Sequence, residues 1–209
     1  MPLLIWSMQL IVYKLLSKNG PRHLCDPWLH QVAEQIRGQF PKIDERVSDT
    51  KKIFLKSPSR IDLFGTEAPG IPLPPTPIST RWGTWISASM YYCEHIEAIR
   101  NVIQKLNPED AVSIDKVQKL ISKDQVEANL TFIYSNYGFL PITIISLEIQ
   151  NVLLADSIKL IETARSEICE VSGTNGTDIN KKCEDVFKKI IDMVHTLSNS
   201  KELSSTDEM

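Results

Sequence analysis

The sequence predicts an all-α or nearly all-α protein, and three observations lead to that prediction. Apolar residues recur at the three- and four-residue spacing of an α-helix along almost the whole chain of 209 residues. The strict alternation of apolar and polar residues that marks a half-buried strand is scarce, and only 8 glycines are present. Prolines and capping residues divide the chain into segments of helical length. We therefore expect helices around one sizeable core, or one core and a fraction.

Two helices are expected before a proline-rich segment. The first begins at Asp26, where an aspartate precedes a proline, and ends near Gly38. The second ends before Pro58 and carries apolar residues at spacings of four and seven, namely Ile43, Val47 and Phe54. Residues 65–78 hold two glycines and five prolines. This composition predicts a connector with polyproline geometry instead of a regular helix.

A helical block is expected after the connector. Ser79 or Thr80 can cap one long helix of about seven turns, which is expected to run to residue 106. A shorter helix is expected to begin at residues 107–110 and to carry Ile114, Val117 and Ile121, and others are expected over residues 126–134, 143–150 and 152–171. A last helix is expected to begin at Asp178, and the polar residues 198–209 are expected to form a disordered tail.

The first sixteen residues are strongly apolar. A signal peptide carries basic residues ahead of its apolar run, whereas the first base here is Lys14, which comes late in that run. The run is also shorter than the ~20 residues of a membrane-spanning helix. We therefore expect a terminal helix that packs on the core, in preference to a signal peptide or a membrane anchor.

Charge and cysteine content narrow the class of protein. The net charge is −3, so no global basic field indicates nucleic acid as a partner. The four cysteines are scattered, which is typical of reduced thiols in a nuclear or cytoplasmic protein. Cys25 and Cys93 each have a histidine nearby, but two loose pairs do not make the four converging ligands of a zinc site. We expect no metal and no cofactor.

Residues 29–172 resemble the middle of hAT-type DNA transposases of a lineage common in arthropod genomes. Three blocks carry the resemblance: residues 29–37 (LHQVAEQIR), residues 51–60 (KKIFLKSPSR) and the proline-rich strap with Thr-Arg-Trp-Gly-Thr-Trp at residues 72–85. Residues 128–141 form a weaker fourth block. Arg81 and Trp82 match the Arg-Trp motif that stands at the entry to the family's helical insertion domain.

The resemblance also implies what this chain lacks. The family's ribonuclease-H-like α/β core holds divalent metal with three acidic residues for phosphoryl transfer, and two of these precede the matched region. Here the first acidic residue is Asp26. A Cys-x-x-His motif is expected just before Leu29, but Trp28 stands three residues after Cys25, so the motif is broken unless His30 substitutes at a longer spacing. The resemblance therefore implies a catalytically incomplete fragment without the α/β core and without enzymatic activity.

This interpretation divides the chain into five segments. Residues 1–28 are an unmatched apolar segment, residues 29–64 a remnant of core-flanking helices, and residues 65–79 the connector. Residues 80–197 resemble the insertion domain, and residues 198–209 are the disordered tail.

The candidate nucleic-acid-binding residues are the Arg-Trp pair and a basic cluster before it: Arg81, Trp82, Lys51, Lys52, Lys56 and Arg60. Residues 37–60 carry seven bases against three acids, and such a cluster contacts phosphates in a salt-sensitive way. Trp82 could stack on a displaced base, although packing in the core is the interpretation that we favour for an aromatic residue at helical spacing.

Two functions stay open from the sequence. One is weak, non-specific association with DNA; the other is a helical protein-interaction module that binds a protein partner or itself. No small-molecule substrate is expected, and a membrane is the least favoured partner.

Overall fold

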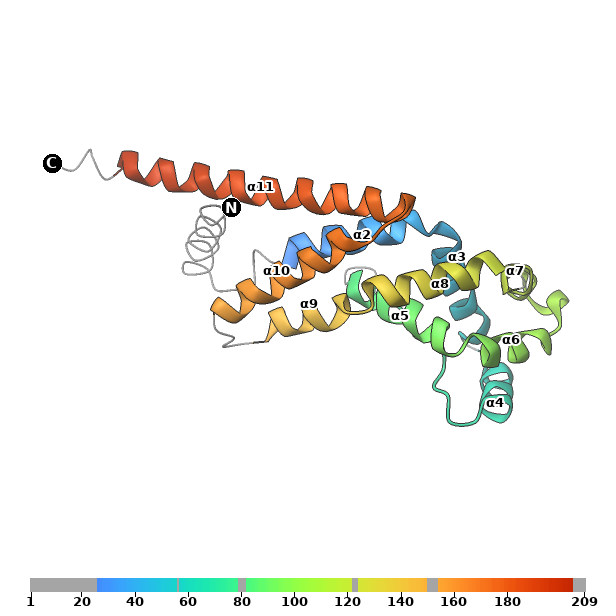
Figure 1. Cartoon of the computed structure of the whole chain (residues 1–209). Helices are drawn as coiled ribbons and strands as arrows, with labels where there is room; N and C mark the ends of the chain where they lie inside the picture. The colour runs from blue at the N-terminus through green and yellow to red at the C-terminus, as the bar shows by residue number, and fades with distance from the viewer. Residues whose placement is uncertain (1–25, 56, 79–81, 122–123, 150–153, 205–209) are drawn as a thin grey trace. The chain divides into compact units, whose positions relative to one another are not determined.

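The computed structural model describes residues 26–55, 57–78, 82–121, 124–149 and 154–204 of the chain (Figure 1). These residues contain helices and no strand, which confirms the all-α prediction. The helices are α2 (Asp26–Gln39), α3 (Pro41–Phe54), α4 (Pro58–Glu67), α5 (Trp82–Glu94), α6 (Ile96–Gln104), a short 3-10 helix η2 (Pro108–Asp110), α7 (Val112–Ile121), α8 (Asp124–Tyr137), α9 (Leu140–Glu148), α10 (Leu154–Glu170) and α11 (Thr174–Ser204).

Helix boundaries largely follow the proline signals in the sequence. Pro41 and Pro58 each stand in the first turn of a helix, where the missing N–H costs nothing and the fixed φ angle suits the helix. The second of these helices, α4, was not among the helices predicted from the sequence. It runs through Gly65 to Glu67, so the stretch without regular structure begins at Ala68 and continues to Ile78.

The long helix expected over residues 80–106 is two helices, because the chain bends at His95. The backbone there has φ −117° and ψ 19°, yet His95 keeps its hydrogen bonds to Tyr91 and Ile99. The bend separates two packing partners, since α5 packs on α8 whereas α6 packs on α7 and α4. One continuous apolar stripe on a straight helix could not face both sets of neighbours.

The chain divides into two compact units, and the divisions fall inside α2, between Gln35 and Ile36, and inside α9, between Pro141 and Ile142. The unit formed by residues 36–141 is built on α3, which packs against α4, α5, α7 and α8. Its core includes the fully buried residues Ile43, Ile53, Trp85, Ile86, Tyr92, Ile99, Val117, Leu130 and Tyr137.

The other unit contains, among the described residues, residues 26–35 of α2 and those from Ile142 onward, and within it α10 packs on α11. The Trp28 ring of α2 meets the Phe187 ring of α11 edge to face, with 5.7 Å between centroids. Helix α11 begins at Thr174, four residues before the predicted start, because Gly173 at φ 90° ends the turn after α10. It extends to Ser204, into the segment for which we expected disorder.

Candidate functional site

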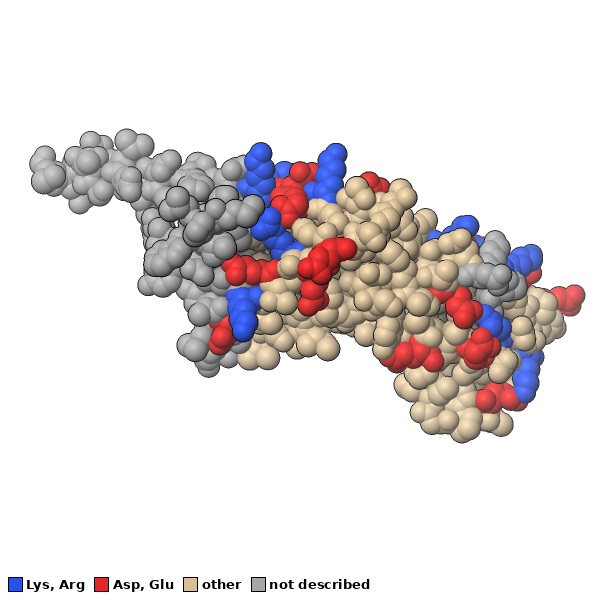
Figure 2. All heavy atoms as spheres, viewed as in Figure 1, with Lys and Arg blue, Asp and Glu red and all other residues tan. Residues whose placement is uncertain are grey.

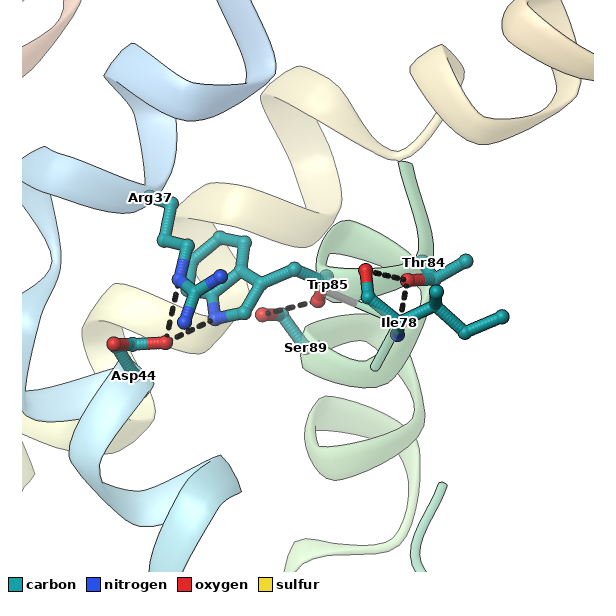
Figure 3. A network of polar contacts seen from close by, with 6 residues as sticks. All are labelled: Arg37, Asp44, Ile78, Thr84, Trp85 and Ser89. Atoms are coloured by element: carbon teal, nitrogen blue, oxygen red, sulfur yellow. Dashed lines mark hydrogen bonds and ion pairs between the residues drawn. The ribbon is translucent and has the colours of Figure 1, made fainter. Parts of the chain in front are cut away.

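The Arg-Trp pair stands where the proline-rich connector enters α5. Arg81 lies outside the described residues; Trp82 is the first residue of α5, and its side chain is likewise not described. The hydroxyl of Thr84 accepts a hydrogen bond from the Ile78 backbone N–H at 2.9 Å and donates one to the Ile78 carbonyl (Figure 3). This double contact fixes the end of the connector to the first turn of α5.

Trp85, the second tryptophan of this stretch, is a core residue with a polar anchor. Its side chain is 1% exposed, and its indole N–H donates to the Asp44 carboxylate at 3.0 Å. The same carboxylate oxygen accepts from Arg37 Nε at 2.6 Å (Figure 3). Asp44 on α3 therefore connects a cation from α2 with the first turns of α5. The packing role that we favoured for Trp82 is shown for Trp85 and remains a prediction for Trp82.

The structure brings part of the predicted basic cluster together. Lys51 and Lys52 lie in the last turn of α3, where positive charge is favourable at the helix carboxyl end. Arg60 on α4 donates from Nη1 to the Ile53 carbonyl at 3.1 Å, which holds its guanidinium beside the end of α3. Lys56, between the two helices, lies outside the described residues.

Several bases of residues 37–60 have intramolecular partners. Lys52 Nζ lies 2.6 Å from the Asp49 carboxylate, and Arg37 pairs with Asp44. Arg60 donates one of its hydrogen bonds to the backbone carbonyl of Ile53. On the face shown in Figure 2, lysines and arginines stand among acidic residues and form no continuous basic surface. The positive field of these bases is therefore weaker than their number in the sequence suggests.

One base of this group, Arg46, is inside the protein, which we did not anticipate. Its side chain is 0% exposed, and none of its three nitrogens has a hydrogen-bond partner among the described residues. The guanidinium carbon lies 5.6 Å from the centroid of the Tyr92 ring, a cation–π distance. Burial lowers the pKa of Arg46 to about 10. A signal existed in the sequence: Arg46 stands three residues after Ile43, on the apolar face of α3.

An exposed apolar stripe is the other feature that the sequence did not reveal. Ile142, Ile145 and Ile149 are 69%, 60% and 54% exposed, and their spacing of three and four places them on one side of α9 and its continuation. Leu140, Ile144 and Leu147 are buried on the other side. Helix α9 carries apolar residues on opposite sides, so periodicity alone could not show which side faces outward.

Other kinds of site have little support among the described residues. No group of three or more His, Cys, Asp or Glu side chains there is arranged to hold a metal ion. An open hollow on α8 is lined by Glu127, Ala128, Thr131, Phe132, Ser135 and Asn136, which include a single titratable group. No individual described helix is both long and apolar enough to cross a membrane, although α8 and α9 meet that test when taken together across their break.

Comparisons of the chain with protein-family models, with curated proteins and with solved structures find no match.

Proposed function

We propose that this chain is a non-enzymatic, transposon-derived helical module that associates with a second copy of itself through α9. The observation that carries the proposal is the stripe of Ile142, Ile145 and Ile149, each more than half exposed. Single exposed apolar residues are ordinary on protein surfaces, whereas contiguous ones mark contact sites.

The surface around the stripe suits contact between helices. From Leu140 to Leu147 α9 carries no charged residue, and Glu148 is its only charge. Burying this surface therefore requires no desolvation of an ion along most of the helix, which is the costly part of burying a helix face.

A second copy of this chain is the partner that fits this surface best. In a two-fold dimer whose axis is perpendicular to α9, the same stripe meets itself and α9 lies antiparallel to its copy. The two Glu148 carboxylates then lie at opposite ends of the contact and do not repel each other. Three isoleucines on one helix contribute far less than the ~800 Å² per partner of a stable interface. The association should therefore be weak and depend on protein concentration.

The test is the molecular mass of the full chain over a range of concentrations in sedimentation velocity. The proposal predicts a shift from monomer to dimer in the micromolar to millimolar range. Ile145→Lys should abolish this shift because it places a charge in the stripe. The matched control is Val112→Lys, since Val112 is an isolated apolar side chain on α7 with 74% exposure. Circular dichroism checks that both variants keep their helical content.

Three outcomes would overturn the proposal. The wild-type chain could stay monomeric at every concentration, or Val112→Lys could weaken dimers as much as Ile145→Lys. The third is binding of the wild-type chain to phosphatidylcholine vesicles that Ile145→Lys removes, because the stripe would then serve a membrane surface.

DNA association is the second candidate, and the proximity of Lys51, Lys52 and Arg60 favours it. The proposal predicts a gel shift that weakens as salt rises, since phosphate contacts release counterions. Lys51→Ala with Lys52→Ala should weaken the shift. Lys181→Ala with Lys182→Ala is the control, because it removes an equal charge from α11. No shift at low salt, or equal losses in both double variants, would contradict a binding site at these lysines.

A further inference from the structure

Helices α10 and α11 form a hairpin whose turn is held by several backbone contacts. Asn180 on α11 donates from Nδ2 to the carbonyls of Cys169 and Val171, at 3.1 and 3.0 Å, and so satisfies the carboxyl end of α10. Gly173 takes φ 90°, a conformation that favours glycine. A Cβ atom on Gly176 would lie 2.5 Å from the Val171 carbonyl oxygen. The two helices are therefore held in one register next to the turn.

This register places two thiols together. Cys169 on α10 is exposed and Cys183 on α11 is fully buried, and both are reduced. Asn180, one turn before Cys183, donates to the Cys169 carbonyl, and Cys169 Sγ contacts Glu184, which follows Cys183, so the two thiols lie at the same level of the hairpin. They stand fourteen positions apart in the sequence, in different predicted helices, so neither spacing nor a motif indicates the pair.

An ion pair borders the thiols on the exposed side. Cys169 Sγ donates to Glu184 Oε1 at 3.2 Å, and Arg165 binds both oxygens of the same carboxylate at 2.8 and 2.7 Å. The guanidinium of Arg165 also lies 4.6 Å from the centroid of the Phe187 ring. These contacts hold the Cys169 thiol at the surface, next to the buried one.

We propose that Cys169 and Cys183 are a redox modification site, at which exchange with a low-molecular-weight disulfide such as oxidised glutathione joins α10 to α11 by a disulfide bond. The juxtaposition of one accessible thiol and one buried thiol on the two helices of a fixed hairpin carries this assignment. The proposal does not depend on the function proposed for α9.

The reaction proceeds in two exchanges. The Cys169 thiol loses its proton to solvent, and the thiolate attacks one glutathione sulfur, which forms a mixed disulfide and releases one glutathione thiolate. The Cys183 thiol then loses its proton and attacks Cys169 Sγ, which forms the Cys169–Cys183 bond and releases the second glutathione thiolate. Both glutathione thiolates take up a proton, so one molecule of oxidised glutathione is reduced as the two cysteines are oxidised.

The surroundings make this exchange slow at neutral pH. Burial, followed by the neighbouring Glu184 carboxylate, raises the pKa of Cys169. Burial raises the pKa of Cys183 to about 12. Since the thiolate is the attacking form, the rate should rise about tenfold per pH unit below these pKa values.

The test uses the full chain, incubated with oxidised glutathione at pH 8, followed by counting of free thiols and mass mapping of peptides without reduction. The proposal predicts the loss of two thiols and one linked peptide pair that contains Cys169 and Cys183. The Cys183→Ser variant should stop at a stable mixed disulfide on Cys169. The Cys169→Ser variant should leave Cys183 unmodified, because it is buried. Cys93→Ser, at a half-buried site in the other unit, should form the link as the wild-type chain does.

Two results would overturn the proposal. The first is accumulation of glutathione on Cys169 in the wild-type chain without conversion to the linked form. The second is linkage of Cys169 to any other cysteine in preference to Cys183. Circular dichroism shows whether the chain unfolds during oxidation. If the chain stays folded, modification of Cys183 in the Cys169→Ser variant would contradict the buried position of that thiol.

Discussion

Arg46 offers a sharp test of the packing of residues 36–141, because its replacement by methionine is expected to stabilise the protein. The guanidinium is fully buried on α3, and no hydrogen bond satisfies its nitrogens among the described residues. Methionine has a similar length and an unbranched, adaptable side chain. The substitution removes a charge from the core without leaving a large cavity.

The magnitude follows from the cost of keeping this charge. Burial is the largest influence on the pKa of Arg46 and lowers it from its ordinary value to about 10. One pKa unit corresponds to about 1.4 kcal/mol, so the charged form costs about 3 kcal/mol relative to the unfolded chain. Methionine loses the cation–π contact with Tyr92, which contributes ~0.5–2 kcal/mol. The free energy of unfolding should therefore rise by about 1–3 kcal/mol, in the range seen when buried ions are replaced by apolar residues.

Urea unfolding at pH 7, followed by circular dichroism, measures this change. The matched control is Arg37→Met in the same unit, which removes the ion pair with the half-exposed Asp44 and should cost up to about 1 kcal/mol. The direction in which the free energy of unfolding changes with pH provides a second check. Because the folded pKa of Arg46 is depressed, the wild-type chain should gain stability as pH rises from about 10 towards 12.5, and Arg46→Met should lack this gain. A loss of more than about 1 kcal/mol in Arg46→Met would refute the reasoning and indicate that Arg46 has a partner in solution.

Three further predictions concern other contacts. Trp85→Phe keeps an aromatic ring but loses the 3.0 Å hydrogen bond to Asp44; it should lower the free energy of unfolding by about 1–3 kcal/mol in urea, and an unchanged midpoint would refute the anchor. Gly176→Ala should lower the melting temperature, since its Cβ would meet backbone at 2.5 Å. Gly65→Ala, in open space within α4, should raise the melting temperature, because alanine has a helix propensity about 1 kcal/mol more favourable than glycine. A higher melting temperature for Gly176→Ala than for Gly65→Ala would contradict the register of the hairpin. Glu184 has a pKa lowered chiefly by Arg165, so its contribution is present above its unfolded pKa and is lost as pH falls through the folded value. In Glu184→Gln the free energy of unfolding should fall less steeply with decreasing pH than in the wild-type chain, by less than about 1 kcal/mol because the pair lies at the surface. An equally steep fall in both proteins would show that another group titrates.

The helical architecture could be predicted because its signals are local. Caps, prolines and a period of 3.6 residues determine where a helix begins, where it ends and which side is apolar, and α2, α3 and α8 follow these signals. The bend at His95 could not be predicted in this way. It arises because α5 and α6 pack on different helices, and packing partners are not encoded in the local pattern.

The candidate sites depended even more on tertiary contacts. The sequence grouped Arg46 with the other bases of residues 37–60, but the position of α3 in the core puts Arg46 inside. Pairing of Lys52 with Asp49 is a local effect that the three-residue spacing could have suggested. The Cys169–Cys183 pair required the register of two helices, and the outward side of α9 required the position of its neighbours.

Hydrogen–deuterium exchange of the full chain at two protein concentrations tests the central claim, association through α9, most directly. At the concentration that favours dimers, exchange should slow in peptides that cover Leu140–Ile149 and should stay unchanged in peptides from α3 and α4. The Ile145→Lys variant should show no dependence on concentration. Protection confined to α3 and α4, or an α9 whose exchange is the same at both concentrations, would contradict the account.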